Sequence, residues 1–217
     1  MMVVLTSAAC SESEGTHQAA AHATDPSSTV EVPTDGNVTR HTTSGNLQST
    51  FDIGCIDVAQ VRNVYSPADL FKGAVACFQS GDDAEGRNLF WFALAYGRFD
   101  IARVADETAH QGLDVLKMSS FEGFSEEDRV RISERLGASI NAPDEWAPFC
   151  QQLRDLGPPA YHPDYMIQHG IRAFQPISAE SGNGLVEDFD PEAAWAMVVD
   201  EYMRCAAKTD SNVSPAE

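Results

Sequence analysis

The chain has 217 residues, of which 43% are hydrophobic, so it is long enough to form one domain with its own core. Its formal net charge is −19 at pH 7, and such a surface repels the phosphates of nucleic acids and of anionic membranes. It would attract a basic protein, although acidic charge also serves solubility alone. The longest apolar run, residues 89–96, is far shorter than the roughly 20 residues that cross a bilayer, so no membrane-spanning helix is expected.

The first ten residues, MMVVLTSAAC, combine a short apolar run with three small residues and Cys10. They resemble the lipobox of bacterial lipoproteins, although Ser7 stands where Leu is usual and no Lys or Arg precedes the cysteine. The resemblance implies a signal-peptide remnant at 1–10, a lipid on Cys10, and a location on the periplasmic side of a bacterial envelope. A chance cysteine in a frayed N-terminus is the alternative.

Residues 11–50 differ in composition from the rest of the chain. They are rich in Ser, Thr, Ala, Gly and Asp, and nearly free of large apolar side chains. Such a segment cannot bury enough surface to offset its ordering entropy, so we predict a disordered tether. Apolar residues become frequent from Phe51 onward. The predicted domain is therefore 51–207, followed by a frayed tail at 208–217.

Helix start and stop signals recur along the domain, which predicts an all-α fold. Ser66 followed by Pro67 marks one N-terminus, and Gly81 and Gly97 mark two helix ends. Apolar residues at helical spacing fill the intervals. We predict helices at about 67–80, 84–96, 100–118, 126–136, 144–156 and 164–169, and a last helix from Asp190. The expected architecture is a helical hairpin or an irregular bundle of about six helices.

The first two helices resemble a tetratricopeptide (TPR) hairpin. The resemblance covers about 30 residues. A generic α-hairpin gives the same pattern. The positions that match are Leu70, Ala74, Cys77, Gly81, Gly86, Phe90 and Ala93. The body also resembles uncharacterised helical lipoproteins of bacterial envelopes, in YSPADLFKGAVACF, YGRFDIARVADETAHQGL and GPPAYHPDYMIQHG. The resemblance to these lipoproteins implies no activity.

Asp106, His110 and Asp114 are spaced four residues apart, on one face of the predicted helix 100–118. Carboxylates beside a histidine raise its pKa and can serve proton transfer. A solvated polar face of an amphipathic helix gives the same pattern.

A second constellation lies in the segment 161–169. Two histidines and an aspartate are possible metal ligands, but their spacing matches no ligand motif, so we predict neither a metal nor another cofactor. Long loops rich in Tyr and His inside a compact domain are often functional. We therefore predict partner contacts at Tyr161, His162, Asp164, Tyr165 and His169.

Without Cys10, four cysteines remain: Cys55, Cys77, Cys150 and Cys205. An even number fits an exported protein, and we predict at least one disulfide. The first choice of pair is Cys77 with Cys150, because both interrupt apolar stripes of strong helices. Buried reduced thiols are the alternative.

These features favour a non-catalytic protein-binding module of the bacterial envelope. Either an immunity protein against a basic toxin or an envelope scaffold would fit. The alternative is a hydrolase or a metal-dependent enzyme that uses His110 or the loop His162–His169. A binder should present an acidic or aromatic surface patch, whereas an enzyme should present a deep pocket with convergent histidines and carboxylates.

Overall fold

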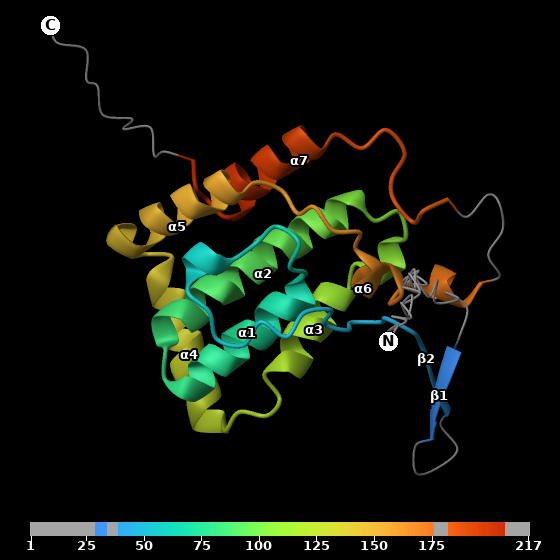
Figure 1. Ribbon diagram of the computed structural model, residues 1–217, viewed down its shortest axis with the longest axis horizontal. Coiled ribbons are helices and arrows are strands. Elements are labelled where there is room, and N and C mark those ends of the chain that lie inside the picture. Colours follow the sequence, from blue (N-terminus) through green and yellow to red (C-terminus); the bar gives the residue numbers. More distant parts are fainter. Residues whose placement is uncertain (1–28, 34–38, 176–181, 207–217) are drawn as a thin grey trace, which may run out of the picture.

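Helices build most of the body, as the computed structural model shows (Figure 1). The structure describes residues 29–33, 39–175 and 182–206. The predicted lipid site Cys10, the predicted tail 208–217 and much of the predicted linker lie outside these residues. The all-α fold is confirmed, with a small two-stranded hairpin before the helices. No helix among the described residues has the length and apolar character needed to cross a membrane.

The elements follow one another closely along the chain. The α-helices are α1 (Pro67–Ser80), α2 (Asp83–Arg103), α3 (Gly112–Ser120), α4 (Glu126–Ser139), α5 (Pro143–Leu156), α6 (Asp164–Ile167) and α7 (Pro191–Met197). Short 3-10 helices are η1 (Val58–Gln60), η2 (Glu107–Ala109) and η3 (Ile171–Phe174), and the π-helical turn η4 (Val198–Tyr202) extends α7.

The antiparallel hairpin of α1 and α2 forms the centre of the molecule (Figure 1). Ser66 caps α1, because its hydroxyl accepts a hydrogen bond from the Asp69 N–H, and Gly81 ends α1 with φ 84°. Gly86 allows the close approach, since a Cβ there would lie 2.9 Å from the ring of Phe78. Helix α1 covers one side of α2, while α7 and η4 cover another, so α2 is buried along most of its length.

Helix α2 does not end at Gly97, where the sequence pattern predicts its end. It continues to Arg103, and Gly97 provides close packing instead, because a Cβ there would collide with the side chain of Leu113. The predicted helix 100–118 is accordingly wrong. Backbone hydrogen bonds from Ala105 to Gly184 and from Val186 to Arg103 pair this segment with a distant one and interrupt the helix.

The N-terminal strands fall within the range predicted to be a disordered tether. Strands β1 (Thr29–Pro33) and β2 (Thr39–Thr43) pair antiparallel, with Thr29 opposite Thr43. Hydrogen bonds between backbones account for this hairpin, and composition does not reveal them.

Residues 43–51, named the strap here, lie against the helical body. The Thr43 hydroxyl donates to the Gln168 carbonyl, and the Leu47 N–H donates to the Tyr165 carbonyl at 3.0 Å. At the other end of the strap, two backbone N–H groups donate to Asp69 Oδ1 at 2.7 Å each. The strap, which precedes the predicted domain start at residue 51, is thus hydrogen-bonded to the helical body at both of its ends.

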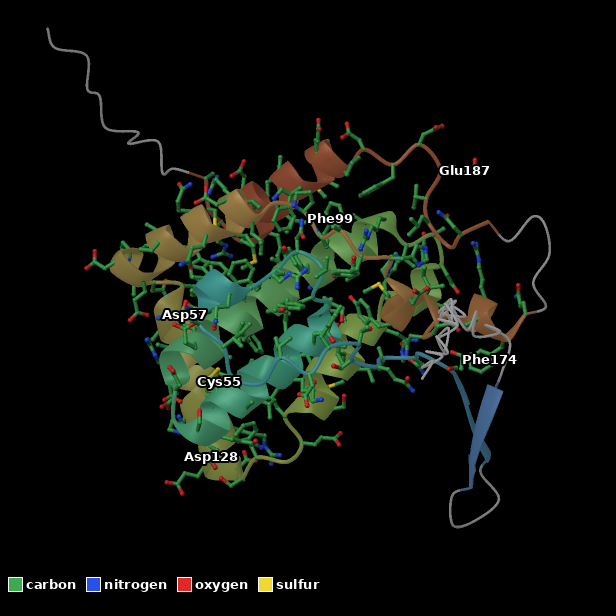
Figure 2. The ribbon with its side chains drawn as sticks, viewed as in Figure 1. Cys55, Asp57, Phe99, Asp128, Phe174 and Glu187 are labelled. Carbon is green, nitrogen blue, oxygen red and sulfur yellow. A yellow bond between two sulfur atoms is a disulfide. The ribbon has the colours of Figure 1, made fainter. Side chains whose placement is uncertain are left out.

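Two disulfides are present, which confirms the prediction of at least one. Cys55 pairs with Cys77 at a Cα–Cα distance of 4.6 Å, and Cys150 pairs with Cys205 at 5.5 Å. Cys55 lies beside α1 (Figure 2). The predicted pair of Cys77 with Cys150 is wrong, because each of these helices is stapled to a neighbouring irregular segment rather than to the other helix.

Candidate functional site

The tyrosines of the predicted binding segment point into the molecule. The phenol groups of Tyr161 and Tyr165 both donate to Asp100 Oδ2 at 2.8 Å. Asp100 is fully buried in α2, and Tyr165 is only 4% exposed. Tyr165 is therefore a core residue, and its predicted role as a surface contact is wrong. Tyr161 is half-buried with its hydroxyl turned inward, so it too serves the interior.

Arg103 completes this buried network. Its Nε–H donates to Asp100 Oδ1 at 2.8 Å, and its guanidinium lies over the rings of Phe99 and Tyr161. Burial raises the pKa of the Asp100 carboxyl, and the Arg103 charge and the two phenols oppose that rise. Burial and the nearby carboxylate raise the pKa of both phenols, so they stay protonated and act as donors. The network fastens the segment 161–165 to α2.

Asp106, His110 and Asp114 do not form one site. The chain leaves the helix after Arg103, and His110 Nε2 lies 2.9 Å from the Val104 carbonyl. Asp106 caps η2, while Asp114 pairs with Lys117 at 2.9 Å. Asp106 Oδ2 also accepts the Arg172 N–H at 2.9 Å, so the three groups take separate partners and do not converge.

The histidines of the segment 161–169 also take separate partners. His162 Nδ1 lies 2.9 Å from Asp164 Oδ1, and this contact raises the pKa of the exposed His162. His169 Nδ1 lies 3.0 Å from Asn46 Oδ1 in the strap. Among the described residues, no group of three or more His, Cys, Asp or Glu side chains is arranged to hold a metal ion.

We predict that acid weakens the strap through His169. Partial burial lowers the pKa of His169 below 6.5, because the folded environment disfavours the charged ring. The unfolded chain therefore takes up this proton near pH 6.5 and the folded chain only at lower pH, so stability falls as the pH drops through that interval. Urea unfolding at pH 7.5 and 5.5 should show a larger loss for the wild type than for His169→Gln. Parallel losses would contradict the prediction.

Two surface hollows lie on opposite flanks of α5. The first, named the acidic hollow here, is bounded by η1, the start of α2 and one flank of α5, and has a volume of about 400 Å³. Four carboxylates and one guanidinium line it, so its charge is negative. Its lining residues are Asp57, Val58, Glu85, Arg87, Asn88, Asp144, Glu145, Pro148, Phe149 and Gln152.

The carboxylates of the acidic hollow differ in the hydrogen bonds and ion pairs that they form. Glu145 forms ion pairs with Arg87 and Arg135, and the hydrogen bond from Arg135 is the main cause that lowers its pKa. Glu85 accepts the Val58 N–H at 2.8 Å. Asp144 is exposed and has no hydrogen bond or ion pair within the described part of the chain. It is therefore available to a ligand.

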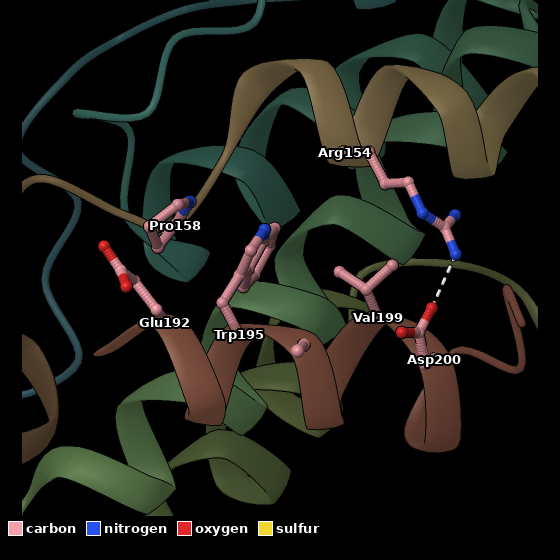
Figure 3. A pocket seen from close by; sticks show the side chains of 7 residues that line it. Arg154, Pro158, Glu192, Trp195, Val199 and Asp200 are labelled. Carbon is pink, nitrogen blue, oxygen red and sulfur yellow. Dashed lines mark hydrogen bonds and ion pairs between the residues drawn. The ribbon is translucent and has the colours of Figure 1, made fainter. Parts of the chain in front are cut away.

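The second hollow, named the α5–α7 hollow here, has a volume of about 280 Å³ (Figure 3). Trp195 and Val199 of α7 and η4 point toward α5 and form its floor. The ion pair between Arg154 and Asp200 lies on one side, and Glu192 lies on the other. The complete lining is Arg154, Pro158, Glu192, Trp195, Ala196, Val199 and Asp200.

Several contacts hold the floor of the α5–α7 hollow in place. The Trp195 ring packs against Tyr96 and Phe99, with centroids 5.6 Å and 5.9 Å apart. The disulfide of Cys205 fastens the segment after η4 to α5, and Arg154 also donates to the Cys205 carbonyl at 2.8 Å. These contacts fix the position of the side chains that form the floor.

Sequence reasoning predicts neither hollow. Asp144 and Glu145 look like ordinary first-turn acids of a helix, which they also are. The run of acids from Glu187 to Glu192 is the one local signal near the α5–α7 hollow. No protein-family model matches the chain, and no significant match was found among curated proteins or solved structures.

Proposed function

We propose that the protein is a non-catalytic protein-binding module of a bacterial envelope, and that its partner is a basic protein. The acidic hollow carries this proposal. Its carboxylates come from three separate elements, and Asp144 has no internal partner among the described residues. A lysine or arginine side chain that enters the hollow would meet converging acceptors and the apolar wall of Phe149.

The charge of the whole chain supports the same partner class. A net charge of −19 speeds encounter with a cationic surface, and added salt should slow association more than dissociation. The two disulfides favour an oxidising compartment, and the lipobox-like Cys10 remains the proposed anchor. An immunity protein that neutralises a basic toxin and a scaffold for envelope assembly would both fit this kind of surface.

A matched pair of charge variants tests the location. Gln152 lines the acidic hollow, whereas its neighbour Gln151 is exposed and does not, so Gln152→Lys and Gln151→Lys change the net charge equally on the same helix. With a lysine-rich peptide as the probe in calorimetric titration, Gln152→Lys should weaken binding about tenfold and Gln151→Lys much less. Equal weakening would show that the attraction is diffuse and would overturn the acidic hollow as the binding place. Thermal melting checks that both variants fold.

A further inference from the structure

We infer that the α5–α7 hollow receives one aliphatic or aromatic side chain of the basic partner, flanked in the partner's sequence by Lys or Arg. This inference rests on the proposed function and names the chemistry of the partner at a second contact.

The shape of the hollow suits a single side chain. Its volume of about 280 Å³ lies just below the usual range of sites for small molecules. Trp195 and Val199 are 9% and 3% exposed and supply the apolar floor, while Pro158 forms a wall. An inserted leucine or phenylalanine would replace water against these groups.

The floor is held by aromatic packing and by a disulfide, which favours its use as a binding site for a side chain. Trp195 is packed against two aromatic rings of α2, and the disulfide of Cys205 fastens the segment that follows η4 to α5. A preformed hollow needs little ordering when it is filled, and side chains buried in such hollows dominate the energy of many interfaces.

The rim selects the charge of the occupant. Asp200 is neutralised by Arg154, but Glu192 is exposed and pairs with no basic side chain within the described part of the chain. Glu187 and Asp188, also exposed, precede α7. A basic flank complements this rim. A second copy of a chain with a net charge of −19, or an anionic lipid surface, would be repelled.

Two peptides distinguish binding of a side chain in the α5–α7 hollow from the general electrostatic attraction. The probes are a lysine-rich peptide with one central leucine and the same peptide with serine at that position, titrated calorimetrically against the full chain. The leucine should raise affinity about tenfold. Ala196→Phe, at an exposed lining position, should remove this gain and leave the affinity for the serine peptide unchanged. Ala193→Phe, exposed on the same helix but outside the hollow, should do neither.

The outcomes distinguish this inference from the proposed function. Equal affinity of the wild type for both peptides would overturn the inference that the α5–α7 hollow binds an apolar side chain, while leaving the acidic hollow as a cation site. If the higher affinity for the leucine peptide persisted in Ala196→Phe, the leucine would bind outside the α5–α7 hollow, and the inference would also be overturned. Failure of both peptides to bind would overturn both the proposed function and the inferred binding of an apolar side chain in the α5–α7 hollow.

Discussion

Replacing Asp100 with alanine is expected to lower the free energy of unfolding by about 3–5 kcal/mol. The carboxylate is fully buried and accepts hydrogen bonds from Arg103, Tyr161 and Tyr165. Its removal leaves a buried guanidinium without its counter-charge and two buried phenols without acceptors, and each unsatisfied group adds a desolvation cost. Urea denaturation followed by far-UV circular dichroism measures the loss.

Two further variants show whether the network is the cause. Tyr165→Phe removes one donor and should cost about 1–3 kcal/mol. Asp114→Ala is the matched control, because that carboxylate is 63% exposed and, among the described residues, forms an ion pair with Lys117 alone; its loss should stay within about 0.5 kcal/mol. If Asp100→Ala costs no more than Asp114→Ala, the buried network does not stabilise the fold.

Removal of the disulfides is the second large effect that we expect. The Cys150–Cys205 bond closes a separation of 55 residues and the Cys55–Cys77 bond one of 22. From loop-closure entropy, replacing the first pair with alanine should cost about 4 kcal/mol and replacing the second about 3 kcal/mol. Chemical denaturation of the two double variants under non-reducing conditions gives these values.

The pairing can be checked independently by mass spectrometry of non-reduced digests. Peptides that join Cys55 to Cys77 and Cys150 to Cys205 are expected. A peptide that joins Cys77 to Cys150, or four free thiols, would contradict the structure.

The helices that sequence predicted well begin at local signals. Ser66 and Ser125 cap α1 and α4 as expected, since a hydroxyl that accepts a hydrogen bond three residues ahead acts within one turn. The break after Arg103 could not be predicted in this way. It depends on backbone pairing with residues 184–186, which lie some 80 positions away in a segment without a strong pattern of its own.

Neither hollow could be located from the sequence. The net charge is the ground for proposing a basic partner, but it carries no information on where carboxylates gather. Tyr161 and Tyr165 were assigned to the surface because the sequence does not distinguish an exposed tyrosine from one that donates a hydrogen bond to a buried carboxylate. In the sequence, Asp100 has the features of an ordinary N-cap of a helix that starts at residue 100. Only the packing of the folded chain shows that it lies in the core.

The strap also constrains the order in which the chain can assemble. Its contacts with Asp69 join residues 18–20 positions apart, so they can form as soon as α1 has been synthesised. Its contacts with Gln168 and His169 span 125 and 123 positions. Because synthesis proceeds from the N-terminus, one end of the strap can dock early, while the other must wait until α1–α6 have emerged. The strap is therefore synthesised before the helices, but its contacts with Gln168 and His169 are among the last to form.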